Sequence, residues 1–221
     1  MGKTAPEWLS SLRKDMELIT EDAAREHWPG PGVDDTPYYN YRLEHVRQVE
    51  RDALRLLDEV GGDRDVVLAS VWIHDRFQPQ FSGPDHAALG AQWARQHLGS
   101  TGFPQHKVEQ VSFAVTMHSN EPHTIPPTAN EARLLWDADG LGKMGAASVV
   151  VFLCSMTAFP QNVVTHSTLA ERGLQSLDDA RPMIDSFYFQ PSRVWAEERQ
   201  RTEQQFYEAL AREVGHGSHL L

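Results

Sequence analysis

The sequence predicts an all-α protein, because apolar residues recur at three- and four-residue steps along most of the chain. Sustained alternation of polar and apolar residues, which is typical of half-buried strands, is not seen, and hairpin signals are few. With 221 residues, of which 40% are hydrophobic and 23% charged, the chain is long enough for one globular domain with a sizeable core. No fixed repeat and no Ser/Gly-rich linker divides it.

The first three expected helices follow from apolar spacing and from the residues that end a helix. One apolar face near the N-terminus is formed by Trp8, Leu9, Leu12, Met16 and Ile19. This helix should end at the turn-forming segment WPGPGVDDTP (28–37). A second helix is expected over about 43–60, before Gly61 and Gly62. Asp63 or Asp65 can cap a third, which contains the run VVLASVWI and should continue to Pro79.

The rest of the chain is also expected to be helical. Further helices are predicted over 84–98, 105–118, 129–138 and 143–157. The last helix should span about 191–214, with apolar positions at Trp195, Phe206, Leu210 and Val214. These segments leave little of the chain for any other fold class.

Composition limits the classes of partner and location. The net charge is −11 and no cluster of Lys and Arg interrupts it, so binding of a nucleic-acid polymer is not expected. The single Cys154 cannot form an internal disulfide, and its apolar surroundings indicate a small buried hydrophobe. No signal peptide is visible, and no apolar run approaches the roughly 18 residues that cross a bilayer. We therefore expect a cytoplasmic protein without membrane attachment.

Histidines and carboxylates stand at the edges of several apolar helical stretches. They are His45, His74, Asp75, His86, His118, Asp137 and Asp139. In a shared internal cleft, each would need its own hydrogen-bond partner unless a metal ion satisfied it. Neutral imidazole and carboxylate suit borderline divalent metals such as Mn, Fe, Ni, Co or Zn. The ordered set therefore predicts a divalent metal site, although the His74-Asp75 dipeptide alone has low specificity.

The order His45, His74-Asp75, Asp139 resembles the H…HD…D pattern of the HD superfamily of metal-dependent phosphohydrolases. The segments YRLEHVRQVERDA, LASVWIHDRF, DHAALGAQWA and EARLLWDADGLGKMGA also follow in the order familiar from small bacterial HD-domain hydrolases. The resemblance covers roughly residues 38–212. It implies a single-domain HD-type helical bundle with a metal site in its central cleft. The core would span about 38–160, with C-terminal helices over about 165–214 packed on it.

Carried over residue by residue, the resemblance implies roles for particular side chains. The metal ligands would be His45, His74, Asp75 and Asp139. His86 and His118 would complete a second metal site or contact substrate phosphate. The acid that positions or activates water would be Glu44, Asp75 or Asp137, and the cations that hold phosphate would be Arg47, Arg76 and Lys143. The last three are equally interpretable as ordinary surface charges.

The resemblance implies a phosphohydrolase in which a divalent metal (Mn, Ni, Co, Fe, Zn or Mg) activates water for attack on phosphorus. The expected substrate is a nucleotide or another small phosphorylated metabolite, and a homodimer is compatible with this reading. A di-iron HD-type oxygenase is the alternative, because six candidate ligands are present. A non-catalytic binding module is disfavoured, since no ligand position is missing. Gly140, Gly142 and Gln48 depart from the subgroup's usual residues, which leaves substrate preference open.

Overall fold

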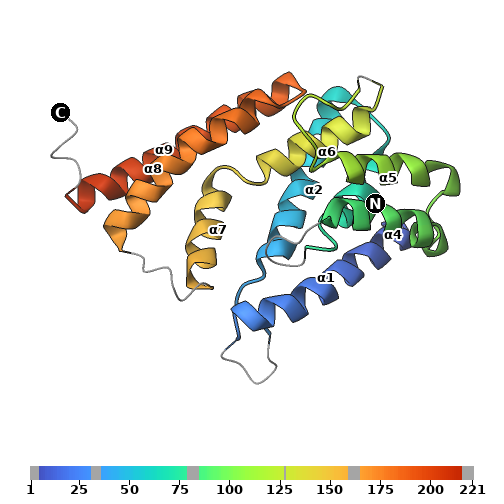
Figure 1. Cartoon of the computed structure of the whole chain (residues 1–221), viewed down its shortest axis with the longest axis horizontal. Coiled ribbons are helices and arrows are strands. Elements are labelled where there is room, and N and C mark those ends of the chain that lie inside the picture. Colours follow the sequence, from blue (N-terminus) through green and yellow to red (C-terminus); the bar gives the residue numbers. More distant parts are fainter. Residues whose placement is uncertain (1–4, 31–35, 79–84, 127, 159–164, 216–221) are drawn as a thin grey trace. The chain divides into compact units, whose positions relative to one another are not determined.

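The computed structural model describes residues 5–30, 36–78, 85–126, 128–158 and 165–215, and it contains helices but no strand over these residues (Figure 1). This confirms the predicted all-α class. The chain divides into two compact units, Met1–Asp139 and Gly140–Leu221. The α-helices are α1 (Glu7–His27), α2 (Tyr41–Val60), α3 (Arg64–Ile73), α4 (His86–His97), α5 (Val108–Met117), α6 (Asn130–Leu141), α7 (Ala146–Thr157), α8 (His166–Asp185) and α9 (Gln190–Glu213).

Helix α3 is the centre of the first unit. It packs against α1, α2, α4 and α5, and every residue from 66 to 73 is buried. The run VVLASVWI has no polar face, so a helix formed from it is stable only when surrounded. Its N-cap is Asp63, whose carboxylate accepts hydrogen bonds from the backbone N–H groups of Asp65 and Val66. One of the two predicted caps is therefore confirmed.

The prediction that this helix continues to Pro79 is wrong, because α3 ends at Ile73. The His74 N–H donates to the carbonyl of Ser70 at 2.9 Å, as in a helix. The Arg76 N–H then donates to the carbonyl of Ile73 at 3.0 Å, which is the shorter loop of a tight turn. The turn places His74 and Asp75 at the buried end of the helix. Pro79 itself lies outside the described residues.

Helix α4 is held close to the Ile73 end of α3, and the start of α6 is held close to the other end. On α4, a Cβ added to Gly90 would lie 3.2 Å from the carbonyl oxygen of Ile73, so glycine permits the close approach. On α6, the side chain of Asn130 donates to the carbonyl of Gly61 at 3.0 Å. Glu131 accepts from the Asp63 N–H at 2.9 Å. These contacts fix the start of α6 against the loop between α2 and α3.

The second unit consists of α7, α8 and α9. Helices α8 and α9 lie side by side (Figure 1), and α7 packs on α9. A Cβ at Gly173 of α8 would lie 2.2 Å from the ring of Tyr207 on α9, so the missing side chain allows this pairing. Gly145, with φ of 85°, delays the start of α7 to Ala146, three residues after the predicted start. The packing of these helices on the core stays a prediction.

Helix α7 is the most apolar helix of the second unit. Its residues Val149 and Met156 are buried, whereas Val150 and Leu153 are exposed. Cys154 is half-buried instead of fully buried, and desolvation raises the pKa of its thiol. Among the described helices, none alone has the length and apolar composition of a membrane span, and α6 and α7 meet that test only when taken together.

Candidate metal centre

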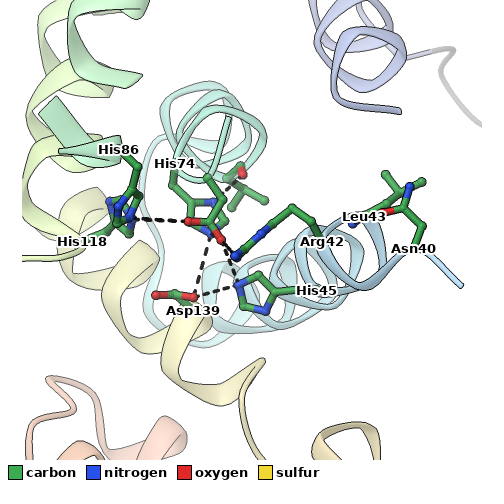
Figure 2. Close-up of polar contacts among 10 residues, drawn as sticks. Asn40, Arg42, Leu43, His45, His74, His86, His118 and Asp139 are labelled. Carbon is green, nitrogen blue, oxygen red and sulfur yellow. Dashed lines mark hydrogen bonds and ion pairs between the residues drawn. The ribbon is translucent and has the colours of Figure 1, made fainter. Parts of the chain in front are cut away.

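Six side chains from five helices converge beside the end of α3. Figure 2 shows His45, His74, His86, His118 and Asp139 directed toward one another, and Asp75 lies among them. His45 comes from α2, His74 and Asp75 follow α3, His86 opens α4, His118 follows α5 and Asp139 comes from α6. All six residues to which the resemblance assigns metal binding are therefore in this cluster, within the first unit.

The first group of potential ligands is His45, His74 and Asp139. Their ligand atoms lie within 4.8 Å of one another. His45 Nε2 is 3.0 Å from Asp139 Oδ1, and His74 Nε2 is 3.9 Å from the same oxygen. All three residues are buried. The spacing is suitable for three atoms that share one ion.

The second group is Asp75, His86 and His118. His86 Nε2 and His118 Nε2 are 3.2 Å apart. They lie 3.7 Å and 3.8 Å, respectively, from Asp75 Oδ1. His118 and Asp75 are buried and His86 is partly open to solvent. This group has the same composition of two imidazoles and one carboxylate.

Asp75 connects the two groups. While its Oδ1 faces the second group, its Oδ2 lies 3.5 Å from His45 Nε2 and 3.3 Å from His74 Nε2. One carboxylate therefore presents an oxygen to each set of ligands. This arrangement is suited to two neighbouring cations that share a carboxylate.

The buried imidazoles satisfy a direct test of whether a metal fits here. The Nε2 atoms of His45 and His74 are buried and make no well-aligned hydrogen bond, although carboxylate oxygens lie 3.0 Å and 3.3 Å away. This is costly unless another ligand satisfies them. His74 Nδ1 lies 2.7 Å from the carbonyl of Val71, and His118 Nδ1 lies 2.6 Å from that of Val115. Such bonds orient the ring so that Nε2 faces the cluster. The nitrogen and oxygen donors fit a borderline divalent metal.

Electrostatics favour the metal-binding protonation state at Asp75 and His45 but oppose it at His74. Burial opposes ionisation of Asp75, but the charges of His74 and Arg42 hold the pKa of its carboxyl well below the ordinary range. Burial lowers the pKa of His45, against the raising effect of Asp139. For His74, burial is outweighed by Asp75 and Asp139, which raise its pKa. Asp75 is thus a carboxylate and His45 a neutral imidazole, as metal ligation requires.

Arg42 belongs to the centre but is not among the residues singled out from the sequence. Its guanidinium is buried, and Nη1 contacts Asp75 Oδ2. It also lies over the ring of Tyr41, 4.9 Å from the ring centroid. The available signal is its position three residues before His45, which puts both side chains on one face of α2.

Other predicted residues have partners of their own. Glu44 pairs with Arg47 at 2.9 Å, and Arg47 also pairs with Glu17 of α1 at 3.0 Å. Arg76 pairs with Asp15 at 3.0 Å and stacks over the ring of Trp93. All the partners of these predicted site residues lie outside the ligand cluster.

Asp137 and Lys143 are the remaining residues that the sequence suggested for the site. Asp137 is fully buried on α6. It leaves the helix about 200° around the axis from Asp139, because successive residues are about 100° apart. Lys143 is exposed and belongs to the second unit. Neither is in the two ligand groups, so their predicted roles in water activation and phosphate binding stay predictions.

Comparison with known proteins gives a consistent picture. Residues 42–144 match the family model of the HD domain. The fold is similar to a predicted HD superfamily hydrolase from an uncultured Thermotogales bacterium, with 20% identity, a TM-score of 0.60, and coverage of 93% of this chain and 92% of that one. It is also similar to Bacillus subtilis YpgQ in complex with ADP, with 16% identity, a TM-score of 0.61, and coverage of 92% and 98%.

A curated relative shares part of the sequence. It is Ribonuclease Y of Cutibacterium acnes, which is 27% identical over 131 residues. The match covers 51% of this chain and 23% of that protein, so the chain spans about a quarter of the relative's length. The similarity is therefore to one part of a longer protein.

Proposed function

The chain belongs to the HD-domain superfamily through residues 42–144, and on that premise we propose that it is a divalent-metal-dependent phosphohydrolase. The substrate would be a nucleotide or another small phosphorylated metabolite. The observation that carries the proposal is the shared carboxylate of Asp75, which faces two buried groups of ligands. No other described cluster has the composition and spacing of these two groups.

In the proposed reaction, particular side chains would bind metal and others would position water. His45, His74, Asp75 and Asp139 hold the ion, with His86 and His118 available for a second. A bound divalent cation lowers the pKa of a coordinated water and offsets charge on a phosphoryl group. Asp75 is the favoured acid for positioning the attacking water, because both of its oxygens lie inside the cluster. Glu44 is engaged by Arg47 at the surface.

Arg42 is the favoured cation for the phosphate. Its guanidinium is already desolvated beside the ligands, where a charge-assisted hydrogen bond to an anion is stronger than at the surface. Arg47 and Arg76 are occupied by carboxylates from α1. A nucleotide is a reasonable first substrate class, since the similarly folded YpgQ is known in complex with ADP.

The test is a joint measurement of metal content and phosphate release. The purified protein is assayed against nucleotides, sugar phosphates and a short RNA, with elemental analysis alongside. We expect His74→Ala and Asp75→Ala to lose both bound metal and activity while they keep most of the helix content. His106→Ala, at an exposed histidine within the short 3-10 helix Gln105–Lys107, is the matched control. Normal metal binding by either ligand variant would contradict the assignment.

A di-iron oxygenase is the second candidate function. Two groups of three ligands that share Asp75 would also suit a pair of irons. The two functions differ in the metal that the protein binds and in whether oxygen is consumed or phosphate is released. Two irons per chain with oxygen uptake would favour the oxygenase, whereas phosphate release with Mn, Ni or Co would favour the phosphohydrolase.

A further inference from the structure

Arg42 is a buried cation that shares a carboxylate oxygen with the candidate ligands. Only 3% of the residue is exposed. Its Nη1 contacts Asp75 Oδ2, the oxygen that lies 3.5 Å from His45 Nε2 and 3.3 Å from His74 Nε2. The ring of Tyr41 lies over the guanidinium. Arg42 is therefore held against the very oxygen that a cation in the first group would need.

The charges of the centre do not balance two divalent ions. The two groups contain two carboxylates, Asp75 and Asp139, and the guanidinium of Arg42 adds one positive charge. With neutral imidazoles, one net negative charge remains. A first divalent ion turns this into one positive charge, and a second turns it into three. Because the cluster is buried, these charges are screened much less than charges in water.

An anion would reduce this excess of positive charge. A phosphate placed beside the ions would offset most of the excess positive charge and could accept hydrogen bonds from Arg42. Arg42 would then contact the anion as well as Asp75. The increase in affinity is reciprocal. An anion that strengthens binding of the metal ion is itself bound more strongly when the metal ion is present.

Resting on the proposed function, we infer that Arg42 makes the second divalent cation depend on an anionic ligand. Arg42 competes with a cation in the first group for Asp75 Oδ2, and its charge repels a cation in either group. Whichever ion binds second is therefore retained only when a phosphate group is bound. In this role Arg42 is a positioning residue for the metal centre. The consequence is that the two metal ions are bound together only after the phosphorylated substrate has bound.

The experiment counts Mn²⁺ ions bound by the full-length, metal-depleted protein with and without inorganic phosphate. Free Mn²⁺ is followed by electron paramagnetic resonance, and affinities are followed by calorimetry. The wild type should bind one ion without phosphate and a second with phosphate, with an affinity for the second at least about tenfold higher when phosphate is present. Arg42→Met should bind two ions in both conditions, because an unbranched apolar side chain fills the space without charge.

Arg13→Met is the matched control. Arg13 also combines an ion pair, with Glu50, and a position over an aromatic ring, that of Trp72 at 5.6 Å. It lies in the same unit but touches no member of the ligand cluster in these contacts. Its variant should keep the phosphate dependence of the wild type. Circular dichroism establishes that the compared variants are folded.

Several outcomes would overturn the inference. One is a wild type that binds two ions equally well with and without phosphate, which needs no variant to be decisive. Another is a folded Arg42→Met variant with the wild-type phosphate dependence. Either result leaves the proposed hydrolase standing if phosphate esters are still cleaved. Failure to bind any divalent ion, together with no phosphate release, would instead remove the proposed function.

Discussion

His86 differs from the other ligand histidines because its side chain is 19% exposed, whereas that of His118 is 2% exposed. It opens α4 and completes the second ligand group. We expect His86→Ala to lower the number of Mn²⁺ ions bound in saturating phosphate from two to one per chain. The first group, on other helices, should keep its ion. Elemental analysis after gel filtration measures the change.

His97→Ala, at the other end of the same helix and exposed, is the control for this change. It should leave the metal count unaltered. If His86→Ala retained two ions, His86 would instead be a substrate contact, as the resemblance also allows.

Single residues show what the sequence could and could not predict about the centre. The ligands could be predicted because histidines and acids at the ends of apolar helices are unusual and follow a known order. The sequence pointed to Arg47 and not to Arg42, although both lie within three residues of His45. Which of two arginines is buried depends on the neighbouring helices, and here α3 delivers Asp75 to one face of α2.

At the scale of the element, the cap of α3 is a local feature with a measurable effect. Asp63 accepts two backbone hydrogen bonds and pairs with Lys107 at 2.8 Å. Asp63→Ala should lower the free energy of unfolding by about 1 kcal/mol, since the cap is lost. Asp63→Asn should lose less, because asparagine also caps helices. Denaturant unfolding at pH 7 gives both values.

The free energy of unfolding that is lost when Asp63 is replaced should depend on pH. Burial opposes ionisation of Asp63, but the Lys107 ammonium and backbone N–H donors hold its pKa below the ordinary 3.8. A depressed carboxyl pKa stabilises the folded state above the unfolded value and loses that effect as the pH falls through the folded value. The difference between wild type and Asp63→Asn should therefore shrink below pH 3.8. A constant difference would contradict this origin.

Gly90 sets how closely α4 approaches the end of α3. A Cβ at this position would lie 3.0 Å from Val115 Cγ1 and 3.2 Å from the Ile73 carbonyl oxygen. Overpacking costs about 1–3 kcal/mol, while alanine gains about 1 kcal/mol of helix propensity over glycine. We expect Gly90→Ala to lower the melting temperature and weaken Mn²⁺ binding, because Ile73 precedes His74. Thermal unfolding with and without Mn²⁺ tests both effects.

Leu89→Ala provides the comparison for Gly90→Ala. Leu89 is 42% exposed on the same helix, so its truncation should change neither property appreciably. Equal effects of the two substitutions would show that the close approach at Gly90 is unimportant.

The elements themselves could be predicted more fully than their ends. Apolar periodicity placed helices in the segments where α1 to α7 and α9 are found. It missed the end of α3, because the apolar run gives no sign of the turn that follows Ile73. That turn depends on contacts with α4 and on the polar cluster, and both are remote in sequence.

At the scale of the whole molecule, the division into two units was not predicted. The boundary between Asp139 and Gly140 falls inside α6, where no Pro- or Ser-rich linker marks it. Composition alone therefore could not reveal it. The division places the whole ligand cluster in the first unit, and it leaves Lys143 in the second.

The overall charge predicts which phosphorylated molecules the protein can attract. The chain has 31 acidic and 20 basic residues, for a net charge of −11. Several arginines of the first unit are engaged by acids, such as Arg25 by Glu21 and Asp22. A nucleic-acid polymer is bound mainly through many phosphate contacts with free basic residues. A compact phosphate needs only the local positive charge of a loaded metal centre.

We therefore expect a labelled RNA oligomer to bind no more tightly than about 100 µM in 150 mM salt, at the weak end of non-specific binding. Hydrolysis of a small phosphate ester should change little between 50 and 200 mM salt, because the charges that hold it are buried. Fluorescence anisotropy and a phosphate-release assay, both with saturating Mn²⁺, measure the two quantities. Submicromolar RNA binding that weakens steeply with salt would mean that a basic surface outside the metal centre recognises the substrate.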